Sequence, residues 1–125
     1  MVLRLVEPDK ILGSSYARGL EQAAFRVIWA KNAEQAIHST DDLKPDIIVL
    51  EPKISSHSGI EFLHELRSYE DWLNIQVVVY SSVPSYAFGL DELTWQQFGV
   101  ARYLEKSKTS VKELAAICHT ILEDA

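Results

Sequence analysis

Five short apolar runs, separated by segments with helical spacing, constrain the fold of this 125-residue chain more than any other feature. The runs are rich in β-branched residues and cover 2–6, 25–29, 46–50, 75–80 and 101–104. Strand-like runs that alternate with helical segments predict βαβ units and a parallel sheet. The third and fourth runs lack polar alternation, which is typical of strands covered on both faces, so we expect them at the centre. The prediction is an α/β fold with a doubly wound, five-stranded parallel sheet.

The spacing of apolar residues between the runs predicts five helices. Gly99 is well placed to end the fourth helix, and Lys44-Pro45 should end the second. The apolar residues that the first helix carries are Ile11, Leu12, Ala17 and Leu20. The expected helices follow the capping residues Asp9, Asn32 and Ser58, with a fourth over 85–98 and a fifth over 110–122.

Length, charge and residue content exclude several classes of protein. A chain of this size fits one domain over residues 1–125. Its net charge of -6 disfavours direct nucleic-acid binding, since phosphate backbones need a clustered basic face. The single cysteine, Cys118, cannot form an internal disulfide, and the histidines lack zinc-site spacing. The apolar N-terminal stretch is too short for a signal peptide or a membrane span, so we expect a cytoplasmic protein without a membrane partner.

Polar residues follow four of the runs, where the strands should end. Open α/β sheets bind ligands outside the carboxyl ends of their strands, near the point where strand order reverses. We therefore expect three acids, a hydroxyl and a lysine to converge at this edge. The segments concerned are Glu7-Pro8-Asp9, Glu51-Pro52-Lys53, Ser81-Ser82 and Glu105-Lys106-Ser107.

Six segments have an order and spacing that together are specific. They are Leu5-Val6-Glu7-Pro8-Asp9, the residues from Pro45 to Glu51, Ser58-Gly59, Ser81-Ser82, Gly99 and Tyr103-Leu104-Glu105-Lys106. In these segments the chain resembles, over essentially its whole length, the receiver domain of two-component response regulators, the CheY-like family. The resemblance implies sheet order 2-1-3-4-5 with five helices, as in flavodoxin. It also implies phosphoryl transfer to an aspartate ending the third strand, assisted by Mg²⁺ that this aspartate and two acids after the first strand hold.

The resemblance implies a role for individual residues. Glu7 matches the first acid of the pair, but Pro8 stands where the second, metal-ligating acid is expected and offers no side-chain ligand. Glu51 stands at the phosphoacceptor position in place of aspartate. The remaining matches are Ser81 for the hydroxyl residue, Tyr103 for the aromatic switch and Lys106 for the lysine that pairs with the phosphoryl group, while Ser107 replaces the usual proline.

These substitutions weaken the family's chemistry. Mg²⁺ is held mainly through carboxylates, and Asp9 should cap the first helix instead of replacing the acid lost at Pro8. The longer side chain of Glu51 moves its carboxylate outward, while in-line transfer is sensitive to displacements of ~1 Å. We therefore expect no cofactor, weakened Mg²⁺ binding and no metal site. Glu51 should be a permanent charge near Lys106 and Ser81 that only partly imitates a phosphoryl group.

A purely structural role is also open to each of these residues. Glu51 and Lys106 can form an ion pair in a site that does not signal. Tyr103 can be a packing residue, and Ser81 can bond to backbone groups of its loop. Glu7 and Asp9 can act only as negative charges at a helix start.

Three hypotheses for function follow. The leading one is an atypical receiver, a non-enzymatic interaction module of a two-component phosphorelay. The second is a working, Mg²⁺-dependent receiver, with Asp9 assisting the metal. The third is a flavin or nucleotide binder, which needs a loop rich in N–H donors after the first strand. Glu7-Pro8-Asp9 disfavours it because it offers negative charge and one donor fewer.

The segment 85–98 is unusually aromatic, and a helix that is apolar on every side needs something to cover its outer face. The resemblance implies dimerisation and output through this helix, the strand at 101–104 and the helix at 110–122. We therefore expect a protein partner or a homodimer there, with a histidine kinase or an output domain as further partners. Chance exposure of one or two aromatic residues would explain the same pattern without a partner.

Overall fold

The computed structural model describes residues 1–53 and 59–124. Within them the chain forms five strands, five α-helices and two 3₁₀ helices. The strands are β1 (Val2–Val6), β2 (Arg26–Ala30), β3 (Ile47–Leu50), β4 (Gln76–Ser81) and β5 (Val100–Glu105). The helices are α1 (Lys10–Gln22), α2 (Ala33–Asp42), α3 (Gly59–Arg67), η1 (Glu70–Trp72), η2 (Ser85–Phe88), α4 (Glu92–Gln97) and α5 (Val111–Glu123).

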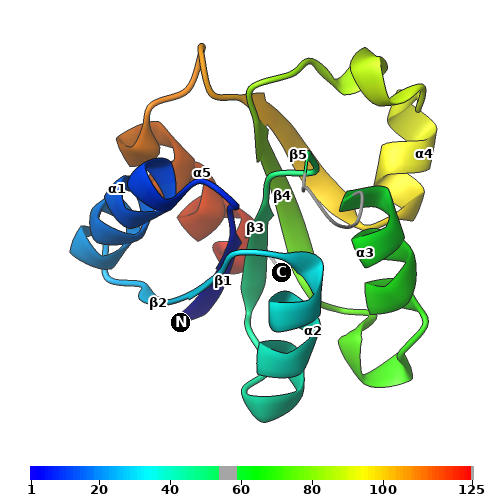
Figure 1. Ribbon diagram of the computed structural model, residues 1–125, viewed down its shortest axis with the longest axis horizontal. Helices are drawn as coiled ribbons and strands as arrows, with labels where there is room; N and C mark the ends of the chain where they lie inside the picture. Colours follow the sequence, from blue (N-terminus) through cyan, green and yellow to red (C-terminus); the bar gives the residue numbers. More distant parts are fainter. Residues whose placement is uncertain (54–58, 125) are drawn as a thin grey trace.

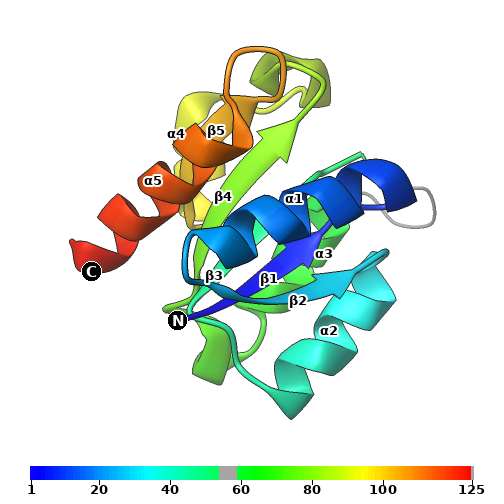
Figure 2. The ribbon, with the colours of Figure 1, turned by 90° about the vertical axis from the view of Figure 1, so that its left-hand side faces the viewer.

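The strands of the described residues form one parallel sheet in the order β2-β1-β3-β4-β5. Helices α1 and α5 cover one face, and α2, α3 and α4 cover the other (Figures 1 and 2). The sheet order and the doubly wound class are as predicted. Because all strands are parallel, the carboxyl ends of β1, β3, β4 and β5 meet at one edge.

Two apolar cores hold the helices to the sheet. Residues of the strands alternate between them, so Leu5 and Val49 face α1 and α5, while Val6 and Ile48 face α2 and α3. Every residue of β3 is buried, as expected for the central strand. No helix in the described part of the chain is long and apolar enough to cross a membrane.

Side-chain caps define the helix starts. Asp9 accepts hydrogen bonds from the N–H groups of Ile11 and Leu12, and Asn32 accepts one from Gln35. These two caps are as predicted. Ser58, the predicted cap of α3, lies outside the described residues.

The predicted continuous helix over 85–98 is wrong. The segment consists of η2 and α4, separated by Gly89 with a left-handed φ of 71°. Glycine adopts this conformation without strain and ends η2, after which Asp91 caps a new helix by accepting from the N–H of Thr94. Gly99, with a φ of 77°, follows the end of α4 as predicted.

The first turn of α1 leaves its apolar residues exposed to solvent. The side chains of Ile11 and Leu12 are 82% and 39% exposed, whereas Gly13 is buried. The physical reason is Trp29 of β2, whose indole fills the space above Gly13. A Cβ atom on Gly13 would lie 2.2 Å from that ring, so this turn rests on the indole instead of on its own apolar side chains.

Arg67 at the end of α3 joins three segments. Its guanidinium donates hydrogen bonds to the main-chain oxygens of Trp72, Leu73, Ile75 and Phe98. Burial lowers the pKa of this guanidinium. These contacts tie α3 to the segment that enters β4 and to the turn before β5.

Arg4 is a second arginine inside the fold, on the central part of the sheet. Its side chain is fully buried, and Nη2 donates to the main-chain oxygens of Ser39 and Leu43 at the end of α2. Burial lowers the pKa of Arg4, and the nearby charge of Asp42 opposes that shift. Arg4 therefore places a positive charge at the negative end of α2.

Candidate functional site

Glu7, Glu51 and Lys106 meet at the carboxyl edge of the sheet. Lys106 Nζ lies 2.5 Å from Glu7 Oε1 and 3.2 Å from Glu51 Oε1. Glu7 and Glu51 follow the neighbouring strands β1 and β3, and Lys106 follows β5. Glu7 is 2% and Glu51 5% exposed, so both carboxylates are withdrawn from solvent. The three side chains form what we call the acid–lysine network.

Every carboxylate oxygen of the acid–lysine network accepts a hydrogen bond. Besides the two contacts of Lys106, Glu7 Oε2 accepts from the N–H of Asp9 at 3.1 Å. Glu51 Oε2 accepts from the N–H of Lys53, and Glu51 Oε1 from that of Ser82, both at 3.2 Å. Buried carboxylates need such partners. In this site the protein supplies them all.

Two aromatic rings complete the surroundings of Lys106. Its Nζ lies 5.3 Å from the centre of the Tyr16 ring and 6.0 Å from that of Tyr80, within cation–π range. Burial by itself lowers the pKa of Lys106, but the hydrogen bond to Glu7 and the charge of Glu51 outweigh it, and the pKa is raised. Lys106 is therefore a protonated, positively charged ammonium group at neutral pH.

Tyr80 supports this arrangement from β4. Its hydroxyl donates to the main-chain oxygen of Thr109 at 2.6 Å, and burial raises its pKa to about 12. The ring also packs edge to face against Tyr16. Sequence reasoning missed both tyrosines, because aromatic residues in a strand and a helix are ordinary core residues until their neighbours are known.

Asp9 lies beside the acid–lysine network without joining it through its carboxylate. That group caps α1, as the sequence predicted, and only the main-chain N–H of Asp9 reaches Glu7. Pro8, between the two acids, has neither a side-chain ligand nor an N–H group.

Ser81 and Tyr103 both contact Val83 in the segment after β4. Ser81 is fully buried, and its Oγ accepts from the N–H of Val83 at 3.2 Å. The hydroxyl of Tyr103 donates to the main-chain oxygen of Val83 at 2.6 Å. Burial raises the pKa of Tyr103, whose ring packs edge to face on Trp95 of α4.

The donor set of this site does not fit a magnesium ion. Mg²⁺ requires near-octahedral oxygen ligands. Glu7 and Glu51 are already bonded to Lys106, whose ammonium lies between them, and Pro8 adds no oxygen from its side chain. Within residues 1–53 and 59–124, no three His, Cys, Asp or Glu side chains are grouped closely enough to hold a metal ion.

A doubly wound sheet with acids after β1 and β3 and a lysine after β5 defines a CheY-like domain. Residues 3–118 match the family described as Response regulator receiver domain. The chain belongs to this family, whose members are in general signalling modules that interact with kinases and output domains.

Individual proteins are similar to this chain in sequence or in fold. The KDP operon transcriptional regulatory protein KdpE of Escherichia coli is 23% identical over 119 residues, which are 90% of this chain and 52% of that protein. The chain thus spans about half the length of this relative. A sensor protein from Polaromonas sp. JS666 has a TM-score of 0.86 at 19% identity, covering 98% of this chain and 96% of that one. A CheY-like receiver domain protein from Methanospirillum hungatei JF-1 has a TM-score of 0.85 at 15% identity, with coverages of 98% and 94%.

Proposed function

We propose that this domain is an atypical receiver, an interaction module of a two-component system that takes no phosphoryl group at position 51. The observation that carries this proposal is the closed acid–lysine network. Lys106 bridges Glu7 and Glu51, and all four carboxylate oxygens already have partners within the protein.

The charges of the acid–lysine network favour one fixed arrangement of its three side chains. Two buried carboxylates without a cation between them raise each other's pKa and repel. In this domain Lys106 supplies the positive charge from within the chain, so the acids need no metal. Glu51 carries a charge of about -1 against the -1.5 to -2 of a phosphoryl group, so it imitates that group only in part.

A continuous set of contacts links Glu51 to the surface of α4 and β5. Glu51 accepts from the N–H of Ser82, and the next residue, Val83, accepts the hydroxyl of Tyr103. Tyr103 in turn packs on Trp95 of α4. We propose that the charge of Glu51 biases this surface, which with α5 binds a protein partner or a second copy. An exposed apolar residue on α4 supports the proposal, Leu93 at 61%, and a second, Tyr86 at 79%, lies on η2, the helix before α4 in the chain.

Incubation with Mg²⁺ and a small phosphodonor, such as acetyl phosphate, is expected to leave the mass of the protein unchanged. The reason is that Glu51 is bonded to Lys106 and the metal ligand at position 8 is missing. Intact-mass spectrometry measures the outcome directly. A single phosphoryl adduct that is lost in Glu51→Gln would instead support the working, Mg²⁺-dependent receiver.

A double variant, Pro8→Asp with Glu51→Asp, serves as the matched positive control. It restores both acids that the family pattern expects and leaves Lys106, Ser81 and Glu7 in place. We expect this variant to accept a phosphoryl group under the conditions in which the unmodified chain does not. Phosphorylation of the double variant, without phosphorylation of the unmodified chain, would assign the loss of phosphorylation to positions 8 and 51.

Glu51→Gln is expected to change self-association, or binding to a partner, by about fivefold or more, since coupling between sites is typically of that order. The amide keeps an oxygen for Ser82 and Lys106 but removes the charge. Sedimentation velocity over a range of protein concentrations measures the effect. The control is Glu34→Gln, which removes an exposed charge from α2, a helix outside the proposed surface. Equal association constants for Glu51→Gln and the unmodified chain would leave the acid–lysine network a structural ion pair only.

A further inference from the structure

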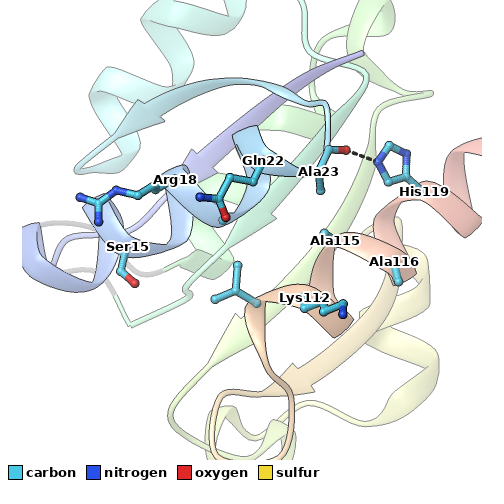
Figure 3. A pocket seen from close by; sticks show the side chains of 10 residues that line it. Ser15, Arg18, Gln22, Ala23, Lys112, Ala115, Ala116 and His119 are labelled. Atoms are coloured by element: carbon cyan, nitrogen blue, oxygen red, sulfur yellow. Dashed lines mark hydrogen bonds between the residues drawn. The ribbon is translucent and has the colours of Figure 1, made fainter.

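A groove of about 690 Å³ runs between α1 and α5, outside the acid–lysine network and the surface of α4. Figure 3 shows its two walls, with Ser15, Arg18 and Gln22 on α1 and Lys112, Ala116 and His119 on α5. The lining residues run from 15 to 23 and from 111 to 119. Eight steps of 1.5 Å give a length of about 12 Å, or two helical turns.

The floor of the groove is shallow because the two helices touch there. A Cβ atom on Gly19 would lie 2.6 Å from the side chain of Val111, so α1 and α5 are in close contact at this point. His119 closes one end of the groove (Figure 3): its Nε2 lies 2.6 Å from the main-chain oxygen of Ala23, and its ring stacks on Phe25. The groove is therefore a fixed feature of the packed helices.

The lining is positive, although the chain as a whole has a net charge of -6. Arg18 and Lys112 line the two walls, and the lining residues include no carboxylate. Both side chains are exposed, and neither forms an ion pair with the residues that the structure describes. Of the acids on neighbouring turns, Glu113 is engaged in the capping box with Ser110, and Glu21 is not among the lining residues.

We propose that this groove binds an amphipathic helix of a partner protein, one whose apolar stripe is flanked by acidic residues. An open channel between two helices has the shape that accepts a third helix, whereas drug-sized ligands need sites that enclose most of their surface. The apolar stripe lies along Gly19, Val111 and Ala115, and the flanking carboxylates meet Arg18 and Lys112. Charge complementarity selects an acidic helix over a basic one.

The test uses a fluorescein-labelled synthetic helix with a Leu/Ala stripe flanked by Glu, and a second peptide in which Lys replaces each Glu. We expect fluorescence anisotropy to show binding of the acidic peptide to the unmodified chain. Arg18→Glu with Lys112→Glu should weaken it by about tenfold or more, because two attractive contacts become repulsive. Lys44→Glu with Arg26→Glu has the same net charge and alters exposed side chains outside the groove, so it should bind the peptide unchanged.

A variant that narrows the groove without changing its charge adds an independent measurement. Ala116→Gln places a longer side chain at an exposed lining position and should also weaken binding of the acidic peptide. Absence of binding at millimolar peptide, equal binding of the Lys peptide, or equal loss in the control double variant would overturn the proposal. Self-association that Arg18→Glu with Lys112→Glu abolishes would also overturn it, by showing that a second copy occupies the groove.

Discussion

Replacing Lys106 with methionine is expected to lower the free energy of unfolding by about 3–5 kcal/mol at neutral pH, the usual cost of removing one partner of a buried ion pair. The variant leaves Glu7 and Glu51 next to each other, buried and without a positive charge. Methionine keeps most of the apolar length of the lysine stem, so the loss reports the charge. Urea unfolding followed by circular dichroism measures it.

The pH dependence of this variant gives a second, independent measurement. Without the ammonium, the two buried carboxylates repel each other in the folded state whenever both are charged, and protonation of either one relieves this repulsion. Groups with a raised folded pKa stabilise the fold at low pH and lose that contribution as pH rises. The deficit of Lys106→Met should therefore be small near pH 4 and grow towards pH 7.

In the unmodified chain the same rule applies to Lys106 itself. Its pKa is raised above the ordinary value of 10.5, so its stabilising contribution is complete below that pH and is lost above it. Lys108→Met is the matched control, because Lys108 is 75% exposed and lies 3.5 Å from Glu105. An exposed pair of this kind contributes about 0–1 kcal/mol. A Lys106→Met variant as stable as this control at pH 7 would contradict the role we assign to the network.

Arg67→Ala is expected to lower the free energy of unfolding by about 3 kcal/mol, because it leaves several partly buried main-chain oxygens without donors. Arg67→Lys should recover little of the loss, since one ammonium group cannot reach acceptors spread over Trp72, Leu73, Ile75 and Phe98. Chemical denaturation of both variants measures these effects.

The loss of stability in Arg67→Ala should also be concentrated in the segments that Arg67 contacts. Hydrogen exchange should quicken at the start of β5, which follows the turn that Arg67 holds through Phe98. Arg26→Ala removes an exposed arginine from the edge strand β2 and should change stability by no more than about 0.5 kcal/mol. Identical stabilities of Arg67→Ala and Arg26→Ala would show that the four contacts contribute nothing net.

Local patterns were sufficient to predict most of the fold. The apolar runs predicted both ends of all five strands to within one residue, and Asp9 and Asn32 predicted two helix starts. The prediction failed at 85–98, where helical spacing continues across Gly89 and only its left-handed conformation interrupts the helix. The spacing also did not show that Gly13 is buried while Ile11 is exposed, because the residue that covers Gly13 is Trp29, which is distant in sequence.

The candidate site was partly predictable for a related reason. Parallel topology places the ends of β1, β3 and β5 at one edge, so the sequence alone predicts that Glu7, Glu51 and Lys106 lie together. Their bonding could not be predicted, since it depends on distances of a few tenths of an ångström and on main-chain donors such as Ser82. The role of Arg67 could not be predicted, because an arginine at the end of a helix is usually solvated.

Cys118 on α5, the single thiol of the chain, is fully buried, and burial raises its pKa to about 12. Thiol reagents react with the thiolate, so alkylation of Cys118 requires that α5 first separates from the sheet. The rate of alkylation therefore measures how often α5 separates from the sheet, and no label has to be introduced. The Cys118 thiol is thus a native chemical reporter on α5, the helix that forms one wall of the groove between α1 and α5.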